Sequence, residues 1–404
     1  MTPLKRVARL RVSNVDKKSA GGEVPVRLCN YTDVYYRDAI RPDQEFMTAT
    51  ATREQVANFR LRVGDVIVTK DSETAEDIGV PAYVESGAQD LVCGYHLAVV
   101  RPDPSLLDGR FLYWSMSSTP VRQQLATAAT GVTRFGLRTE SLAAATVMLP
   151  KLDDQRAIAD YLDTETARID ALIEKKRRMV SVLREQRQSV IDDVVMGLIP
   201  IDGVSPTVGR SEMRLRFLLR ERDVRGQASE EVLSVYRDLG VLPKAGRVDN
   251  FNKTPADLSL YKLALPGDVV VNKMKAWQGS IAVSRYRGIV SGDYLVCSVV
   301  GDVDRSFLHH LLRSRPMVGE YARRSNGIRP SQWRLYWEGL AEIRASLPPR
   351  DSQHVMAAYL DAETNRIDAV VACMQTQVSL LQEHRQALIT AAVTGELTIP
   401  ELAA

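Results

Sequence analysis

Two stretches of the chain carry apolar residues at alternating spacings of four and three positions. This spacing places the apolar side chains on one stripe of an α-helix and is the a/d pattern of a coiled coil. The stripe reads Ile169, Ile173, Lys176, Val180, Leu183, Arg187, Val190 and Val194 in the first stretch, and Ile367, Val371, Met374, Val378, Leu381, Arg385, Leu388 and Ala392 in the second. We predict two long helices, each ending near a glycine, Gly197 or Gly395, at the C′ position.

The two helical stretches are copies of one repeat. Residues 149–171 read LPKLDDQRAIADYLDTETARIDA and residues 347–369 read LPPRDSQHVMAAYLDAETNRIDA, so LP, a glutamine, YLD and RID recur without a gap. A match of this length indicates an internal duplication. At the start of each copy, Asp153-Asp154 and Asp351-Ser352 favour a helix N-terminus. We predict a short helix through Tyr161 or Tyr359, after which Thr164 or Ala362 leads into the long helix.

The segment before the first repeat has a different pattern. Short β-rich runs at residues 24–31, 64–70 and 95–102 alternate with turn signals, which predicts strands. Residues 110–127 have apolar positions at helical spacing, and Pro120 must lie near the first or last turn of that helix. The segment is predicted to be a mixed α/β domain.

The segment between the repeats shows the same order in diverged form. ALPGDVVVNK at residues 264–273 corresponds to RVGDVIVTK, SGDYLVCSVV at 291–300 to CGYHLAVV, and residues 307–322 to the first helix. The loops differ: DSETAEDIGV after Lys70 is acidic, whereas MKAWQGSIAV after Lys273 is basic and aromatic. A duplicated scaffold with diverged loops predicts two similar binding platforms with different ligands.

The predicted fold class is therefore α+β, with two mixed α/β domains separated by two long helices. The domains are residues 1–148 and 210–346, and the helical spacers are residues 149–200 and 347–400. Because domains and helices alternate along the chain, the simplest closure pairs the two helices as an antiparallel coiled coil with an internal pseudo-two-fold axis. Arg187 and Arg385 fall on the stripe, where a polar residue can fix register; the alternative is that each arginine lays its stem over the stripe and reaches solvent.

Composition supports a folded protein without a membrane segment. No apolar run approaches the roughly 18 residues that a membrane span needs, and the first residues are too polar for a secretory signal, so we expect a cytoplasmic protein. The four cysteines, Cys29, Cys93, Cys297 and Cys373, have no CxxC or histidine partner at ligand spacing. We expect neither disulfides nor a zinc site, and no cofactor.

Charge points to a polyanionic partner. Residues 206–346 carry 23 Lys and Arg against 15 Asp and Glu, a basic excess that nucleic acid can use. Arg and Lys can pair with phosphates or guanine, and Asn and Gln can read adenine. The candidate DNA-binding residues are Lys273, Lys275, Trp277, Gln278, Arg323, Arg324, Asn326, Arg329 and Gln332 in the second domain, and Asn30, Tyr31, Lys70, Thr133, Arg134 and Arg138 in the first. The alternative is a solvated basic loop with core tryptophans.

Catalytic patterns are missing from the sequence. GDVIVTK and GDVVVNK resemble a metal-dependent nuclease centre, but Val68 and Val271 stand where a second carboxylate is needed to hold the metal. The sequence has no GxxxxGK[ST] phosphate loop, no Gly-rich cofactor fingerprint and no NPPY-like tetrapeptide. We predict a chain without catalytic residues.

The order of domain, LPxxxxQ…YLD…ETxRID helix, second domain and second helix ending in AAVTGEL resembles the specificity subunit of type I restriction-modification systems. The resemblance covers essentially the whole chain and includes GVT and GIR near the domain ends. It implies two target recognition domains that read the halves of a split, asymmetric site in double-stranded DNA. It also implies helices that dock two modification subunits, which carry S-adenosylmethionine and methylate DNA, and a restriction subunit with motor and nuclease activity that adds cleavage.

Two other functions are compatible with the sequence. The chain could be a stand-alone DNA methyltransferase or nuclease, which the missing motifs disfavour, or an adaptor that binds only proteins. A linear fall of log affinity with log salt, with a slope of several units, separates DNA binding from the adaptor function. The acidic run at residues 71–77 departs from what a DNA-facing loop should show.

Overall fold

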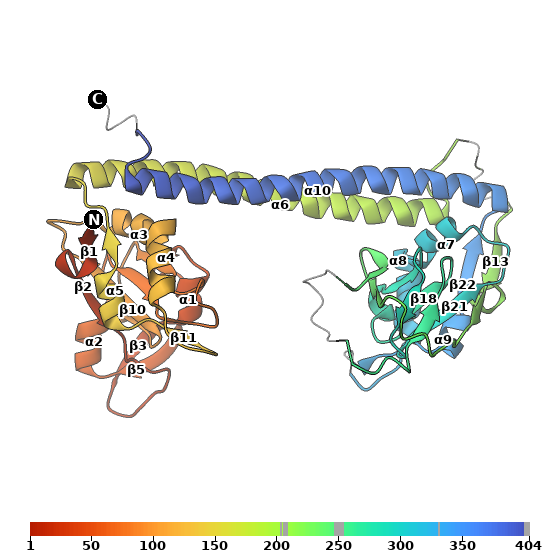
Figure 1. Ribbon diagram of the computed structural model, residues 1–404, viewed down its shortest axis with the longest axis horizontal. Helices are drawn as coiled ribbons and strands as arrows, with labels where there is room; N and C mark the ends of the chain where they lie inside the picture. Colours follow the sequence, from red (N-terminus) through yellow and green to blue (C-terminus); the bar gives the residue numbers. More distant parts are fainter. Residues whose placement is uncertain (203, 205–208, 246–253, 330–331, 400–404) are drawn as a thin grey trace. The chain divides into compact units, whose positions relative to one another are not determined.

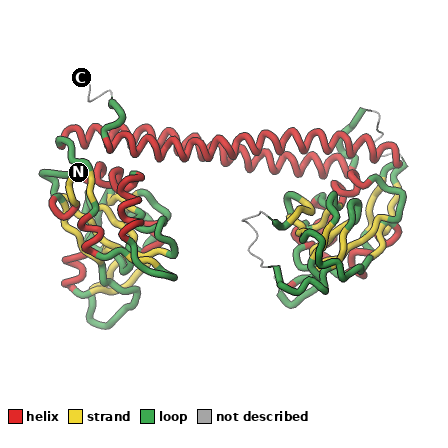
Figure 2. Tube along the Cα trace, in the orientation of Figure 1, coloured by secondary structure: helices red, strands yellow, loops and turns green. Residues whose placement is uncertain are grey.

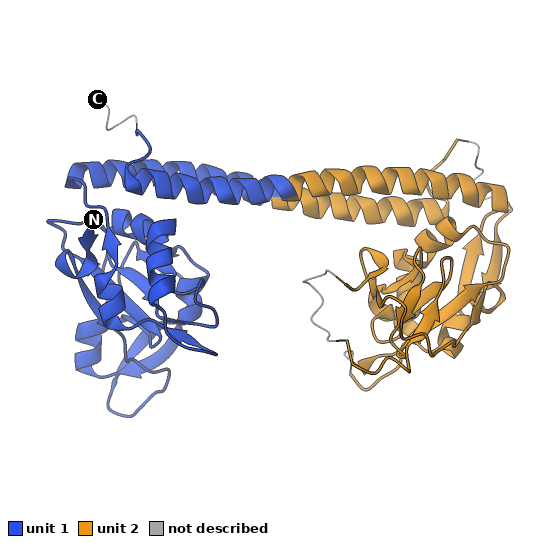
Figure 3. Cartoon of the chain, in the orientation of Figure 1, with its two compact units in different colours: residues 1–176, 376–404 blue, residues 177–375 orange. Residues whose placement is uncertain are grey.

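The computed structural model describes residues 1–202, 204, 209–245, 254–329 and 332–399, and the chain divides into two compact units (Figure 3). Unit 1 comprises residues 1–176 and 376–404, and unit 2 comprises residues 177–375. Each unit therefore contains one mixed α/β domain and a part of each long helix. Residue 400, the predicted end of the second helical spacer, lies outside the described residues.

A five-stranded sheet of order β2-β10-β6-β8-β4 forms the centre of unit 1. Neighbouring strands are antiparallel except β4 and β8, which are parallel. In β6, Val66 and Val68 pack in the cluster that includes helices α3 and α4, whereas Ile67 packs in a second cluster on the other face. Alternate residues of a strand point to opposite faces, so a run of apolar residues without polar interruption marks a strand covered on both sides. The strand bounds are β2 Ala8–Val12, β4 Ala39–Ile40, β6 Val66–Thr69, β8 Pro81–Val84 and β10 Leu97–Pro102.

A smaller sheet of order β5-β3-β9 covers one of these faces, and short helices complete unit 1. Figure 1 shows α3 and α4 between the strands of this unit and the long helices. The remaining elements of unit 1 are β1 Thr2–Pro3, η1 Leu4–Arg6, β3 Val24–Cys29, α1 Tyr31–Tyr35, β5 Met47–Ala51, α2 Arg53–Phe59, β7 Asp71–Ser72, β9 Leu91–Cys93, α3 Gly109–Ser117, α4 Thr119–Ala128, β11 Phe135–Gly136, α5 Thr139–Ala144 and β12 Thr146–Val147.

The three strands predicted in the first domain are present as β3, β6 and β10. The single helix predicted for residues 110–127 is wrong, because the segment forms two helices. Ser118 adopts an extended conformation (φ −71°, ψ 150°) between α3 and α4, and Pro120 lies in the first turn of α4. Proline fits the first turn, where its missing N–H is not needed, and its ring would clash farther along a helix.

Unit 2 contains an antiparallel sheet of order β14-β21-β18-β19. Its strand β18 repeats the pattern of β6: Val269 and Val271 pack in one core cluster and Val270 in another. The predicted helix at residues 307–322 is again divided, into α7 and α8. The elements are β13 Ser211–Arg214, η2 Leu215–Phe217, β14 Leu219–Glu221, β15 Leu233–Tyr236, β16 Gly240–Pro243, β17 Lys262–Ala264, β18 Val269–Asn272, η3 Ala276–Gln278, β19 Ile281–Val283, β20 Gly288–Val290, β21 Tyr294–Val299, α7 Arg305–Leu312, α8 Arg315–Arg324, α9 Trp337–Ala341 and β22 Arg344–Leu347.

The long helices are α6, Leu152–Met196, and α10, Arg350–Thr394, each 45 residues (Figure 2). The predicted division into a short and a long helix is therefore wrong. The Thr164 hydroxyl donates to the carbonyl of Asp160 at 2.9 Å, so its side chain is accommodated within the helix and does not end it. As predicted, α6 ends at Gly197, whose φ of 72° allows the Leu198 N–H to reach the Asp193 carbonyl at 2.7 Å.

Residues of the predicted apolar stripes lie on the less exposed faces of α6 and α10. In unit 1, Ile169 and Ile173 are buried, and Lys176 Nζ donates to Gln377 Oε1 at 2.6 Å. In unit 2, one cluster joins residues of both helices: Val180, Leu183, Ile367, Val371 and Met374. The stripes therefore mark the surfaces through which the helices meet inside each unit.

Candidate nucleic-acid interface

The glutamine of the LPxxxxQ motif fastens the domain of unit 1 to α6. Gln155 is fully buried, and its Oε1 accepts from the Asp108 backbone N–H at 2.8 Å. Its Nε2 donates to the carbonyls of Leu106 and Pro150 at 3.0 and 2.9 Å. Asp108 in turn caps α3, because its carboxylate accepts from the first backbone N–H groups of that helix. The glutamine of the motif therefore has a structural role at the junction of the domain and α6.

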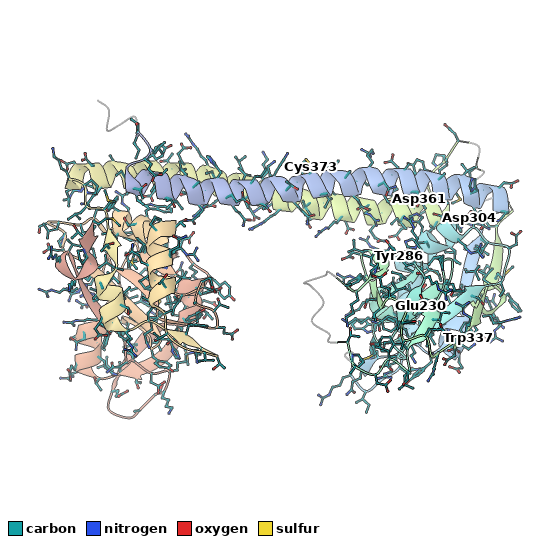
Figure 4. The ribbon with its side chains drawn as sticks, in the orientation of Figure 1. Glu230, Tyr286, Asp304, Trp337, Asp361 and Cys373 are labelled. Carbon is teal, nitrogen blue, oxygen red and sulfur yellow. The ribbon has the colours of Figure 1, made fainter. Side chains whose placement is uncertain are left out.

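The second copy makes the same contact in unit 2. Gln353 is 2% exposed, accepts from the Asp304 N–H at 2.9 Å and donates to the Pro348 carbonyl at 2.8 Å. Asp304 caps α7 as Asp108 caps α3. Figure 4 shows Asp304 and Asp361 near the junction of α7 and α10. The motif shared by the two repeats is thus a structural anchor.

The aspartate of the YLD motif is a second anchor with a different partner in each unit. Asp163 accepts from Trp114 Nε1 at 2.8 Å and from Arg110 at 3.0 Å. Asp361 bonds with His310 Nε2 at 2.8 Å. The hydrogen bond with His310 is the main cause that holds the pKa of Asp361 at about 2. Each repeat aspartate therefore bonds the long helix to the domain of its own unit.

The second long helix in each unit also bonds to the domain. In unit 1, Gln386 of α10 donates to the Ser117 carbonyl at 3.0 Å. In unit 2, Gln188 of α6 donates to the Arg313 carbonyl at 3.4 Å, and Asp192 accepts from the Arg315 N–H at 2.8 Å. Each domain is thus bonded to both long helices within its unit.

The candidate interface of unit 1 is the loop at residues 130–137, which is hydrogen-bonded to the backbone of Lys70. Lys70 follows β6, and its carbonyl accepts from the Leu137 N–H at 2.8 Å. Strand β11 pairs with β7, which brings residues 130–137 beside Lys70. Thr133, Arg134 and Arg138 are exposed on and next to this loop. The structure therefore brings together Lys70 and the three predicted residues that follow α4.

The other two predicted residues of the first domain have internal roles. Asn30 is 8% exposed and lies at the N-cap of α1, where its amide donates to the Leu28 carbonyl. Tyr31 stacks on Tyr35 with ring centroids 5.4 Å apart. Part of the Tyr31 ring reaches the surface, whereas the Asn30 side chain is held within the fold.

Two of the four acidic side chains in the loop after Lys70 have partners in unit 1. Asp71 pairs with Lys70 at 3.3 Å and with His96 Nδ1, and Asp77 accepts a hydrogen bond from Tyr35. That bond raises the pKa of the Tyr35 hydroxyl to about 12. His96 has a φ of 71°, which is uncommon for a residue with a side chain and marks a position worth attention in a binding loop. Sequence reasoning missed Asp71 and His96, because only strand pairing brings them together.

The corresponding loop of unit 2 closes onto Lys273. The Leu335 N–H donates to the Lys273 carbonyl at 2.9 Å, and Trp333 packs edge-on against Trp277 with centroids 5.5 Å apart. Desolvation is the largest cause that lowers the pKa of Lys273. Lys275 and Gln278 border η3 next to Trp277. The predicted residues after β18 are therefore adjacent to the loop at residues 326–335.

The remaining predicted residues of unit 2 form two groups. Asn326, Arg329 and Gln332 are exposed on the loop that closes onto Lys273. Arg323 and Arg324, at the end of α8, both pair with Glu320. These two arginines line a hollow of about 600 Å³ with Glu212, Arg214, Glu320, Glu342 and Arg344. Their positive charge is partly offset there.

No metal site or membrane helix is found within the described residues. They contain no group of three or more His, Cys, Asp or Glu side chains that could hold a metal ion. Over the same residues, none of the helices combines the length and the hydropathy needed to cross a bilayer. Cys29, Cys93 and Cys297 are buried and Cys373 is exposed, all as free cysteines.

These features define a duplicated scaffold in which a loop is hydrogen-bonded to a lysine, Lys70 or Lys273, in each unit. Residues 20–180 match the family model described as the type I restriction modification DNA specificity domain. The resemblance to the specificity subunits of type I restriction-modification systems, inferred from the sequence, is thereby confirmed.

Solved structures agree in fold. A chain from a structure of complex assembly and conformational transition in a type I R-M system is 15% identical, with a TM-score of 0.68 over 98% of this chain and 97% of that one. The HsdS subunit from Thermoanaerobacter tengcongensis is 17% identical, with a TM-score of 0.52 over 98% of this chain and 96% of that one. No curated protein sequence matches.

Proposed function

We propose that the chain is the DNA-recognition and assembly subunit of a type I restriction-modification complex, in which each domain reads one half of a split, asymmetric site. The observation that carries the proposal is the loop closed onto the lysine after the central strand. It occurs in both units, through Leu137 and Lys70 in one and Leu335 and Lys273 in the other. One scaffold thus presents two different sets of basic and amide side chains.

The loops at residues 130–137 and 326–335, which bond to Lys70 and Lys273, are called the recognition loops here. Their side chains have the chemistry that reading of bases requires. Arg134 and Arg329 are exposed on these loops. Asn326 and Gln332 offer amide groups that match adenine, whereas arginine matches guanine. Different side chains at related positions would make the two half-sites different in sequence.

The antiparallel coiled coil of α6 and α10 is part of this proposal. Two contacts support it, Arg187 Nε to Asp368 Oδ1 at 2.8 Å in unit 2 and Arg385 Nε to Asp170 Oδ2 at 3.1 Å in unit 1. Arg187 and Arg385 are equivalent in the two repeats, as are Asp170 and Asp368. The arginine lies on α6 in unit 2 and on α10 in unit 1, so the same pair forms in both directions. Such reciprocity is what an internal pseudo-two-fold axis requires.

The helices also carry a repeated apolar surface that suits the docking of two identical partners. Leu172 and Val370 occupy one repeat position and are 49% and 38% exposed. Val182 and Leu380 occupy another and are 65% and 57% exposed. Unit 1 holds Leu172 and Leu380, and unit 2 holds Val370 and Val182. We assign these pairs to two modification subunits, which bring S-adenosylmethionine and methylate DNA, while a restriction subunit joins in complexes that cleave.

The function is tested by the methylated motif of the host's DNA. Deleting the gene for this chain should abolish methylation at a split, asymmetric motif, and restoring it should bring that motif back. Methylation that persists after deletion would contradict the proposal. Methylation or cutting of DNA by the purified chain alone would show a catalytic protein instead.

Salt dependence tests the DNA contacts directly. Replacing Arg323 and Arg324 with Ala should flatten the slope of log affinity against log salt by roughly 0.9 for each phosphate that the variant no longer neutralises. Arg366→Ala is a matched control, because Arg366 lies on α10 and pairs with Glu363 at 2.8 Å. An unchanged slope in the Arg323 and Arg324 variant would remove these residues from the interface and restrict it to the loops on Lys70 and Lys273.

A further inference from the structure

Two branched apolar side chains project from the recognition loops into solvent. Val132 is 93% exposed and Ile328 is 95% exposed, and among the described residues no other large hydrophobic side chain exceeds the 77% of Tyr36. A single exposed apolar residue needs no explanation. Here, however, the two most exposed ones occupy the same position in two diverged domains, directly after the glycine of GVT and GIR.

Val132 and Ile328 are the tips of the two loops. The turn requires the glycine that precedes each tip. A Cβ on Gly131, which has a φ of 150°, would lie 2.0 Å from the Arg134 carbonyl oxygen. A Cβ on Gly327 would lie 2.6 Å from the Gln332 carbonyl oxygen. Both contacts are with backbone and cannot be relieved by a side-chain rotation. The close turn directs the following residue outward in both units.

Backbone hydrogen bonds close the neck of each loop. Thr130 and Gly136 exchange two N–H···O bonds of 3.1 and 2.9 Å. Asn326 and Arg334 exchange two of 3.1 and 3.0 Å. In unit 1, where every residue of the loop is described, a side chain on the closed loop loses little conformational freedom when it is buried against a ligand, so Val132 is preorganised.

The surroundings of the tips suit a polyanion. Arg134 and Arg329 follow the tips closely and are exposed, and the loops close onto Lys70 and Lys273. An apolar side chain beside arginines is the arrangement by which proteins insert a wedge between stacked base pairs while binding the neighbouring phosphates. A wedge acts on any base step, so it can stay the same while the half-sites change.

We propose that Val132 and Ile328 are apolar wedges that insert into the DNA duplex, one in each half-site, and bend it. The inference rests on the proposed function, because it needs DNA on these loops. Direct reading of a thymine methyl group is the other contact open to an apolar tip. The presence of a branched apolar residue at the tip of both otherwise different loops favours insertion, since a base-specific contact should differ between domains that read different half-sites.

The test replaces both tips with threonine, which keeps the branched shape and substitutes a hydroxyl for a methyl or ethyl group. The control is Val63→Thr: Val63 is 65% exposed in unit 1 and lies beyond the opposite end of β6 from Lys70. The full-length chain is bound to DNA fragments of equal length that carry the host's methylated motif at the middle or near one end. Bent DNA in the middle position migrates more slowly in a gel.

The proposal expects the Val132→Thr, Ile328→Thr double variant to bind roughly tenfold more weakly, since less apolar surface is buried, with the salt slope unchanged. The difference in mobility between middle and end positions should shrink in the double variant and persist in Val63→Thr. Equal binding and bending by the double variant and the original chain would overturn the wedge. Weaker binding with full bending would also overturn it and indicate a thymine contact. If the unaltered chain, assembled with the modification subunits, does not bind the motif at all, the proposed function itself is wrong.

Discussion

Arg187 Nε donates to Asp368 Oδ1 at 2.8 Å, and this contact joins α6 to α10 within unit 2. The side chain of Arg187 is 20% exposed, so its stem covers the apolar stripe while its head group is paired. Arg187 therefore combines the two roles considered from the sequence: its head group bonds to the partner helix, and its stem covers the apolar stripe. The equivalent pair in unit 1 also places Arg385 over the Trp114 ring at 5.8 Å.

The pair should contribute to the pairing of the helices. Arg187→Ala and Asp368→Ala, measured singly and together by urea unfolding, should show a coupling energy of about 0.5–1 kcal/mol, because Asp368 is half exposed and solvent weakens the attraction. The charge-exchanged variant, Arg187→Asp with Asp368→Arg, should recover part of the loss of either single exchange. Additive single effects would show that the contact does not matter for stability.

The buried glutamine anchors should matter more. Gln353→Ala leaves the Asp304 N–H and the Pro348 carbonyl without partners in a site that is 2% exposed. Each unsatisfied buried group costs about 1–3 kcal/mol, so the two groups together should lower the free energy of unfolding by about 2–6 kcal/mol. Gln382→Ala, on the exposed face of α10, should change it by less than about 0.5 kcal/mol. Equal effects of the two changes would contradict the anchor role.

Acid should weaken unit 2 through His309. Burial is the main cause that lowers its pKa to about 3, and its Nε2 lies 2.9 Å from an Arg313 guanidinium nitrogen. In the unfolded chain the histidine has a pKa of about 6.5. Between about pH 6.5 and 3 it is protonated in the unfolded chain but not in the folded chain, so stability is lost as the pH falls through this range. His309→Gln retains an acceptor for Arg313 without titrating. Between pH 7 and 5 the original chain should lose about 2 kcal/mol more than the variant; parallel losses would contradict this.

Strands and repeats could be predicted from the sequence because their periodicity is local. The runs at residues 64–70 and 264–273 needed only alternate apolar positions, and β6 and β18 lie within them. The division of the helix before Pro120 was missed, because an apolar spacing alone does not show that Ser118 leaves the helix. The sequence analysis also predicted a separate short helix before Thr164. Helix α6 continues through this position, because a threonine hydroxyl can bond to a carbonyl within the helix.

The candidate interface could be predicted only as a set of residue types. Lys70 and Arg134 were selected for their charge, but their proximity depends on the pairing of β7 with β11. Asn30 was selected for its chemistry, and its burial at the start of α1 depends on tertiary packing. The hydrogen bond between Asp71 and His96 joins two loops and had no signal in the sequence. Contacts distant along the chain require the fold.

Helix length should set the number of base pairs between the half-sites. One heptad inserted in α6 directly after Lys176 and one in α10 directly before Gln377 keeps the stripes in phase and adds roughly 10 Å, close to three base pairs at about 3.4 Å each. The same heptad inserted after Leu198, beyond the end of α6, lengthens a loop and should leave the gap unchanged. A methylated motif with an unchanged gap in the paired-insertion variant would show that helix length does not set the distance between the half-sites.

The central claim, that two domains read two half-sites independently, is tested most directly by exchanging one domain. Residues 210–346 are replaced by the corresponding segment of a relative with a different methylated motif, and methylated adenines are mapped across the host's DNA. The account predicts that one half of the motif changes to that of the relative, while the other half and its orientation stay the same. A motif in which both halves change, or neither does, would contradict it.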